Sequence, residues 1–375
     1  MVAVLNILRA LWRFVKGSFA LILYALTLIV GGLYILAILA PYIPPIYTVI
    51  PAVLGLLFPL VLGGYVAILC CWLLLRRWRM VLFLGLVFAV SLPSVLIYFP
   101  MNRTQKEELL EGQASLRILS YNVNAFGFRR HSSARPNPVL QYIKASEADI
   151  VCLQEALLAE SPRYGVTFKQ ISQYLGEDYP YMHKGYVQTG GSMLILLSRF
   201  PINDYKRLPL TSSANGGMMY KVQMPDGETT IFNLHLESFR LKKRDGETYI
   251  QFLKDRNAMG LKDAVRGKFA PTFEQHNRQA NVIHTIIAGE ATDRIIVCGD
   301  FNDTPLSYTR RKIATGLSDA FVEAGHGAGI SFSTWFFLVR IDHILLGRAF
   351  EPVGCVVDKS IQVSDHYPII AEVYY

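Results

Sequence analysis

Charge is scarce in this 375-residue chain: Asp, Glu, Lys and Arg make up 18% of it, while hydrophobic residues make up 52%. An average soluble domain carries about 25% charged residues. The shortage is local, because residues 17–75 and residues 80–102 contain no Asp, Glu, Lys, Arg or His. These charge-free stretches exclude a wholly soluble chain, a disordered chain and a collagen-like chain. They predict a membrane part followed by a globular part that is large enough to bury its own core.

The first charge-free stretch is too long for a single membrane helix, which needs about 20 apolar residues. A proline cannot continue a helix without losing a hydrogen bond, and the stretch is interrupted by Pro41, Pro44, Pro45 and Pro51. We therefore expect three transmembrane helices, at about 18–40, 51–75 and 81–99. The first apolar run is longer than that of a signal peptide and two more runs follow, so residues 1–99 are predicted to remain as a membrane anchor.

Basic residues near the ends of the predicted helices indicate the orientation of this anchor. They lie before the first helix and between the second and third, at Arg9, Arg13, Lys16, Arg76, Arg77 and Arg79. Because Lys and Arg next to membrane helices favour the cytoplasmic side, we expect a multi-pass protein whose C-terminal part is non-cytoplasmic. No Asp, Glu, Lys, Arg or His lies inside a predicted span to mark a transport path. The helices are therefore interpreted as an anchor only.

The chain has few cysteines and no CxxC pair, which excludes a zinc ribbon or a similar cysteine-based metal site. Cys152, Cys298 and Cys355 lie in strand-like runs and are predicted to be buried free thiols. The net charge of +8 comes mostly from residues 1–114, so it indicates topology more than nucleic-acid binding. A second basic stretch, 239–278, is either a solvated helical insertion or a surface for an anionic lipid or polyanionic substrate; we favour the insertion.

Residues 100–115 are polar and are predicted to form a linker, after which short β-rich runs alternate with helical stretches. Val, Ile, Leu and Tyr dominate the expected strands, at 116–122, 150–153, 192–197, 229–236, 294–298, 340–346 and 368–373. Helical spacing is present in 138–146 and 275–288. The alternation predicts a mixed α/β domain with layered sheets over residues 116–375.

Polar side chains gather where these predicted strands end. The positions are Asn122, Glu155, His235, Glu237, Asp300, Asn302, Asp342, Asp365 and His366. One such position could be turn or cap chemistry. Several together, rich in carboxylates and imidazoles, predict an oxygen-rich site for a hard metal ion with acid and base groups beside it.

Three motifs carry a resemblance to a known family. They are Gly-Asp-Phe-Asn at 299–302, Arg-Ile-Asp-His at 340–343 and Ser-Asp-His at 364–366, and they occur in family order. With them, residues from about 115 to 375 resemble the endonuclease/exonuclease/phosphatase family, also called DNase I-like, which includes DNase I, neutral sphingomyelinases and inositol polyphosphate phosphatases. The resemblance implies a four-layer αββα sandwich that hydrolyses phosphate esters with Mg²⁺ or Mn²⁺.

The resemblance also implies which residues bind the metal ion. Glu155 matches the dominant carboxylate ligand of the family, and Mg²⁺ typically takes few protein carboxylates because it keeps several waters. Asn122 matches a residue that helps to hold the metal or the phosphate. Asp365 matches an acid near the metal at the C-terminal motif.

Catalytic roles follow from the same match. His366 corresponds to the catalytic imidazole and Asp342 to the acid that orients it, since a carboxylate partner fixes the tautomer of a histidine. Asp300 is expected to orient and activate the attacking water, while Asn302 and His235 contact the phosphate. His343 follows Asp342 on the same strand and points to the opposite face. We expect a structural role for it.

Substrate identity stays open at this level. The family implies a phosphate ester, either in a lipid headgroup or in a nucleic acid, and the lipid bilayer is the other expected partner; no protein partner is readable. The loop 126–136, with three arginines, is a candidate substrate loop. Thr189-Gly-Gly-Ser departs from the family, where many members carry a Tyr or Arg that reaches the phosphate. The alternative function is a membrane-tethered binding or scaffold module of the same fold without activity.

Overall fold

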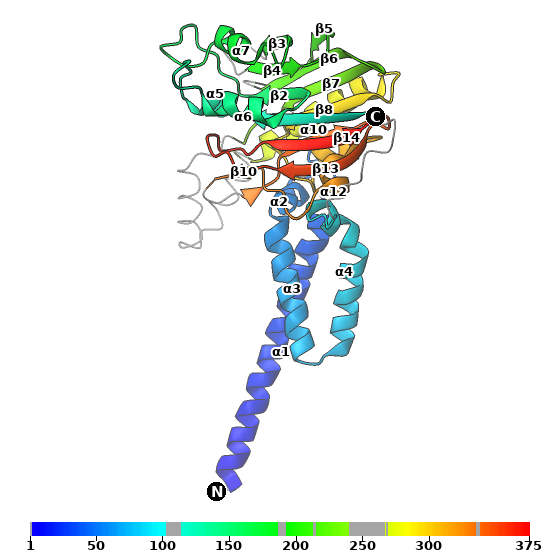
Figure 1. The fold of residues 1–375 in the computed structure, drawn as a ribbon. Coiled ribbons are helices and arrows are strands. Elements are labelled where there is room, and N and C mark those ends of the chain that lie inside the picture. Colours follow the sequence, from blue (N-terminus) through cyan, green and yellow to red (C-terminus); the bar gives the residue numbers. More distant parts are fainter. Residues whose placement is uncertain are drawn as a thin grey trace.

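A computed structural model describes residues 2–102, 114–186, 193–212, 215–239, 267, 269–334 and 338–375. The N-terminal part is helical and projects from one side of a body built of two β-sheets (Figure 1). Its helices are α1 (Val2–Ile38), α2 (Ile50–Leu56), α3 (Phe58–Leu74) and α4 (Trp78–Tyr98). The turn between α3 and α4, with Arg76 and Arg77, lies at the end of these helices that is remote from the sheets.

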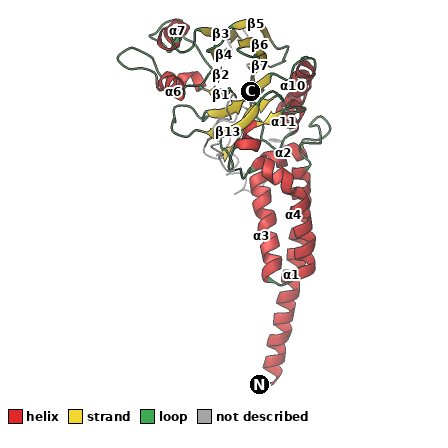
Figure 2. Cartoon of the chain, turned by 45° about the vertical axis from the view of Figure 1, so that its right-hand side comes forward, coloured by secondary structure: helices red, strands yellow, loops and turns green. Residues whose placement is uncertain are grey.

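Two helical segments are long and apolar enough to cross a membrane, Ala20–Ile38 and α4. The pair of α2 and α3 meets the same test together but is bent by 82°. The predicted second span, 51–75, is therefore not one straight helix. Pro59 explains the break, because a proline ring inside a helix clashes with the carbonyl four residues earlier. The short α2 lies at the junction between the helices and the sheets (Figure 2).

Aromatic side chains hold the helices together. Tyr34 stacks on Tyr65 with ring centroids 4.1 Å apart, and the Trp72 indole donates a hydrogen bond of 2.9 Å to Thr27 Oγ1. The Tyr65 hydroxyl donates to the carbonyl of Leu84 over 2.7 Å. Such interhelical contacts stabilise helix packing where the surrounding medium offers no hydrophobic driving force.

Two six-stranded sheets form the body. The first has the order β13-β14-β1-β2-β4-β3, with β1 (Ser115–Asn122), β2 (Ile150–Gln154), β3 (Tyr181–Tyr186), β4 (Met193–Ser198), β13 (Glu351–Val357) and β14 (Ile369–Tyr374). The second has the order β5-β6-β7-β8-β12-β9, with β5 (Ile202–Arg207), β6 (Gly216–Met224), β7 (Gly227–His235), β8 (Ile295–Asp300), β9 (Ser318–Asp319) and β12 (Asp342–Leu346). A small hairpin pairs β10 (Phe332–Ser333) with β11 (Leu338–Val339).

Alternation along the strands creates the layers. In β1, Leu116 and Ile118 belong to the core between the sheets, whereas Leu119 and Tyr121 belong to the core under the outer helices. Successive strand residues point to opposite faces, so a sheet buried on both sides needs apolar residues at nearly every position. Each sheet is covered on its outer face, the first by α6 (Pro138–Ser146) and α7 (Phe168–Leu175), the second by α10 (Ala270–Ala288) and α11 (Tyr308–Ile313). The predicted four-layer αββα sandwich is confirmed.

Most predicted elements are present. Each predicted strand overlaps an observed one, and α6 has the predicted bounds. The expected strands omit β3, β5, β6 and β13 of the two sheets and the two-residue strands β9, β10 and β11. β5 is mostly exposed and polar because it is the edge strand of its sheet, and β13 carries Pro352 and Gly354. Cys152, Cys298 and Cys355 are buried and unpaired, as predicted. The predicted linker lies mainly outside the described residues.

Strand pairing assembles the site edge. β1 pairs with β2 in parallel and β7 with β8 in parallel, so that His235 lies opposite Asp300. β12 runs antiparallel to β8 and sets Asp342 opposite Asp300 as well. Beneath this edge Asn233 of β7 donates to the carbonyls of Leu153 and Ile195 in the other sheet, over 3.2 and 3.1 Å. These buried hydrogen bonds hold the two sheets in register below the site.

Candidate active site

Asn122 connects the two sheets at this edge. Its Nδ2 donates to Glu155 Oε1 over 3.0 Å and to Asp300 Oδ2 over 3.0 Å. Glu155 follows β2 of the first sheet and Asp300 ends β8 of the second. Glu155 adopts a positive φ of 51°, a conformation that is uncommon for a residue with a side chain. The two carboxylates therefore converge, although they come from opposite sheets.

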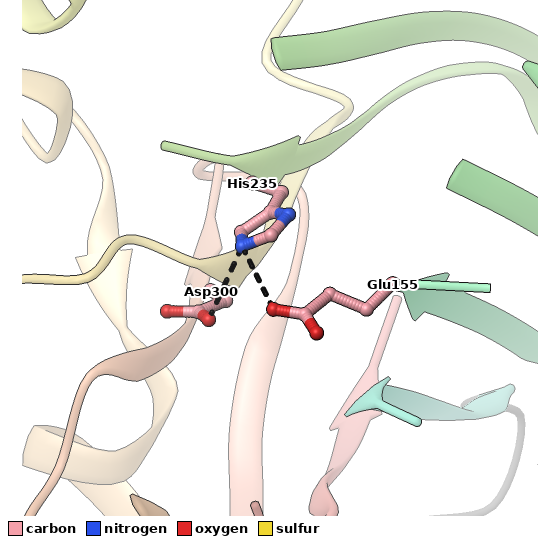
Figure 3. A group of neighbouring side chains, drawn as sticks. All are labelled: Glu155, His235 and Asp300. Atoms are coloured by element: carbon pink, nitrogen blue, oxygen red, sulfur yellow. Dashed lines mark ion pairs between the residues drawn. The ribbon is translucent and has the colours of Figure 1, made fainter. Parts of the chain in front are cut away.

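His235 faces the same carboxylates. Its Nε2 lies 3.4 Å from Glu155 Oε1 and 3.6 Å from Asp300 Oδ2 (Figure 3). Burial lowers the pKa of the His235 imidazole below its ordinary value, although Asp300 acts in the opposite direction. The Asn215 amide lies 3.3 Å from the same nitrogen. A neutral imidazole does not offset the negative charge of the two carboxylates that it faces.

His366 and Asp342 form a second pair. His366 Nδ1 lies 2.9 Å from Asp342 Oδ2, and His366 Nε2 lies 3.5 Å from Asp300 Oδ2. Burial opposes the charged imidazole, but Asp342 and Asp300 outweigh it and raise the pKa of His366 to about 10. Burial raises the pKa of Asp300 to about 6, and the neighbouring His366 limits this rise. Phe332 of β10 covers the imidazole, with ring centroids 4.8 Å apart.

A comparison with models of protein families identifies the family of this chain. Residues 119–366 match the model of the "Endonuclease/Exonuclease/phosphatase family". The chain belongs to this family. Residues 20–98 match a second family, described only as a domain of unknown function. No curated protein matches the chain.

Solved structures with a similar chain trace are distant from this family member. One is an endonuclease/exonuclease/phosphatase from Beutenbergia cavernae, with 17% identity, a TM-score of 0.48, and coverage of 69% of this chain and 71% of that one. Sphingomyelinase C from Streptomyces griseocarneus has 16% identity, a TM-score of 0.48, and coverage of 69% and 99%. TDP2 from D. rerio, complexed with a single-strand DNA product, has 17% identity, a TM-score of 0.47, and coverage of 69% and 99%.

A divalent cation fits the donor set of this family member. Ligand atoms of Glu155, His235 and Asp300 lie within 4.8 Å of one another, and so do those of Asp300, Asp342 and His366. Asp342 Oδ1 is buried without a hydrogen-bond partner among the described residues. Converging carboxylate oxygens with few opposing charges are the ligands that hard cations such as Mg²⁺ and Mn²⁺ prefer.

The remaining predicted residues lie around this centre. Asn302 has a positive φ of 51°, and its amide donates to the Leu236 carbonyl over 3.1 Å. Asp365 is exposed and accepts from Asn124 Nδ2 over 3.0 Å, outside both groups of candidate ligand atoms. His343 is buried on the far side of β12, with Nε2 3.0 Å from the Asp303 carbonyl. The candidate residues at 189–192 and most of the basic stretch 239–278 lie outside the described residues.

Sequence reasoning missed several residues that support the site. Asn215 donates to the Leu236 carbonyl over 2.6 Å beside His235. Ser331 Oγ accepts from the Asp342 backbone nitrogen over 3.1 Å. Neither belongs to a motif, since Asn215 lies just before β6 and Ser331 just before β10. Only the buried state of these two polar residues marks them, and the linear sequence does not give burial.

Proposed function

We propose that this family member is a membrane-anchored phosphoesterase that uses Mg²⁺ or Mn²⁺ to hydrolyse phosphate esters by attack of water on phosphorus. One observation carries the proposal: the Asn122 amide lies 3.0 Å from Glu155, 3.0 Å from Asp300 and 3.5 Å from His366. One carboxylate that can bind a cation, one that can activate water and an imidazole that can protonate the leaving oxygen therefore meet at one centre.

Glu155 is the main proposed metal ligand, because its side chain is 36% exposed and has room for waters of the ion. Asn122 and Asp365 complete the proposed set, and Asn122 also holds Glu155 toward Asp300 through its Nδ2. When bound, a divalent cation stabilises negative charge on the phosphate oxygens.

The protein's own groups handle the protons. Asp300 is buried beside the centre, and its pKa of about 6 suits a group that orients water and takes its proton near neutral pH. His366 is charged and donates a proton or a hydrogen bond to the oxygen that leaves phosphorus. Asp342 holds Nδ1 of this ring and keeps Nε2 directed at the centre. His235 and Asn302 are proposed to contact the phosphate.

Hydrolysis of bis-p-nitrophenyl phosphate by the full-length protein in detergent micelles tests the proposal. We expect turnover with Mg²⁺ or Mn²⁺, none with EDTA, and losses of about 100-fold or more in His366→Ala and Asp300→Ala. His284→Ala, at a half-buried histidine of α10 outside the candidate site, is the matched control and should retain the wild-type rate. Turnover that persists in both site variants would refute the mechanism. No turnover of any phosphate ester would favour the inactive binding module.

Sidedness is part of the proposal. The Arg76–Arg79 turn lies at the end of the helices remote from the sheets, and Lys and Arg favour the cytoplasmic side. We therefore propose that the sandwich is non-cytoplasmic. In intact cells an impermeant thiol reagent should label Lys206→Cys, on exposed β5, but not Arg77→Cys, in the turn. The reverse pattern would place the sandwich in the cytoplasm.

A further inference from the structure

Both strand ends that carry the catalytic carboxylates are bonded to the membrane helices. Thr304 follows Asn302 by two residues, and its Oγ1 donates to the Gly55 carbonyl of α2 over 3.3 Å. Arg340 precedes Asp342 by two residues, and its Nη2 donates to the Ile97 carbonyl of α4 over 2.7 Å. Thr304 and Arg340 are both fully buried. The helices therefore do more than tether the sandwich at a distance.

Apolar packing extends these two bonds. Leu306 belongs to the core of the helical bundle, together with Phe58 and Tyr98. Phe239, which follows the His235 strand, packs with Leu56 of α2. At Gly55, an added Cβ would lie 2.5 Å from the Leu306 carbonyl oxygen, so the backbones approach closely there. The loops after β7 and β8, which form one rim of the site, therefore pack against the membrane helices.

The length of α4 indicates where the hydrocarbon of the membrane ends relative to the sandwich. α4 has 21 residues, or about 31 Å at about 1.5 Å per residue, which matches a hydrocarbon core of about 30 Å. Its upper end, Tyr98, lies beside Phe58, with ring centroids 5.4 Å apart, so both mark the domain-side boundary of the hydrocarbon. The 82° bend between α2 and α3 lies at this level, next to Phe58, so α2 is expected to run along the boundary.

The reacting centre is joined to this boundary by a short stretch of chain. Two residues of chain span at most about 7 Å, so Asn302 is within that distance of Thr304, whose side chain donates to α2. The headgroup layer of one leaflet extends about 5–7 Å beyond the hydrocarbon, so headgroup phosphates and this edge of the site lie on the same side of the boundary. The exposed Arg311 of α11 lies over the Tyr42 ring, in the loop between α1 and α2, at 4.3 Å, which places a cation and an aromatic residue where the helices meet the sandwich.

From these contacts we infer that the substrate is a phosphoester in the headgroup of a membrane lipid of the same leaflet. The inference rests on the proposed phosphoesterase activity. The oxygen of water bonds to phosphorus, a P–O bond of the headgroup breaks, and the leaving oxygen takes up a proton. A nucleic-acid duplex would meet the bilayer at the rim formed by the loops after β7 and β8, whereas a headgroup reaches that rim by lateral diffusion.

The test uses full-length protein in nanodiscs made of equal parts phosphatidylcholine, phosphatidylethanolamine, phosphatidylglycerol, phosphatidylinositol and sphingomyelin. Mass spectrometry follows lipid products, and a DNA oligonucleotide and bis-p-nitrophenyl phosphate are assayed in parallel. We expect lipid turnover to exceed DNA turnover by about 100-fold or more, because shared anchorage raises the local concentration of lipid. Turnover of the small diester without lipid products would overturn the inference and leave the phosphoesterase intact. No turnover even of the small diester would refute the phosphoesterase itself.

A substitution at Gly55 tests the contact between α2 and Leu306. Gly55→Leu forces α2 away from Leu306, so we expect lipid turnover to fall more than about tenfold while turnover of the soluble diester falls less. Gly85→Leu is the matched control, since a Cβ there meets nothing within 4 Å, and it should retain both rates. An equal loss of both rates in Gly55→Leu would overturn the inference, because the contact would then support the site itself and not lipid access.

Discussion

His366 Nδ1 lies 2.9 Å from Asp342 Oδ2, and the two residues come from different sheets. His366 precedes β14 in the first sheet, whereas Asp342 begins β12 in the second. The hydrogen bond therefore closes the site edge between the sheets. It also supplies the negative charge that keeps a buried imidazole protonated.

Asp342→Asn tests this pair. An amide can still contact the ring but carries no charge to stabilise the imidazolium, so we expect the kcat for bis-p-nitrophenyl phosphate to fall about 100-fold or more. Asp293→Asn, an exposed aspartate, should leave kcat unchanged. Wild-type kcat in Asp342→Asn would show that the charge of this acid is not needed.

Glu155→Gln tests the proposed metal ligand. The amide oxygen is a weaker ligand than the carboxylate, so Mn²⁺ affinity should fall about tenfold or more. Electron paramagnetic resonance of free Mn²⁺ measures this without reference to activity. Glu160→Gln, an exposed acid in the loop after β2, is the matched control. Equal Mn²⁺ affinity in both variants would remove Glu155 from the metal site.

The buried carboxyl of Asp319 makes the free energy of unfolding depend on pH. Burial alone would raise the pKa of its carboxyl, but Arg310, which donates to it over 2.7 Å, and His343 hold the pKa far below its usual range. Arg340 adds to this effect, and Glu323 on the short helix α12 (Ala320–Ala324) is the nearby acid. Because the folded-state pKa is lowered, the stabilisation is present above the unfolded-state pKa of about 3.9 and is lost as the pH falls below it.

We therefore expect Asp319→Asn to lose about 3 kcal/mol at neutral pH, since it leaves a buried arginine without its partner. For a domain of this size that is about 6–12 °C in Tm. The Tm difference from wild type should shrink below about pH 4, where the wild-type carboxylate is protonated on unfolding. A difference that is constant from pH 7 to about pH 3 would contradict this account.

Leu306→Ala tests how the packing of the sandwich against the N-terminal helices contributes to stability. Leu306 is buried in the core of the helical bundle, so its truncation should cost about 2–5 kcal/mol. We expect a lower Tm for the full-length protein in detergent. Leu157→Ala, at a leucine that is 51% exposed, should change Tm little. No change in Leu306→Ala would mean that this contact contributes nothing to stability.

Much of the site could be predicted because it depends on local signals. Each catalytic candidate follows or begins a short apolar run, and the parallel pairing of such runs brings their ends to one edge, as at His235 and Asp300. The supporting residues Asn215 and Ser331 could not be found in this way. Their roles depend on hydrogen bonds to residues at the ends of other strands, and no periodicity marks them.

The apolar helices could be predicted from the sequence alone, because a long stretch without charge can be buried only in a membrane or in a protein core. The residue types and the order of the site could be predicted as well, through motifs that lie at strand ends. The bend between α2 and α3, and the hydrogen bond from Arg340 to Ile97, 243 residues away along the chain, could be found only in the folded structure. Hydropathy and periodicity are local properties, whereas the contact between the N-terminal helices and the edge of the sandwich depends on how two folded units pack.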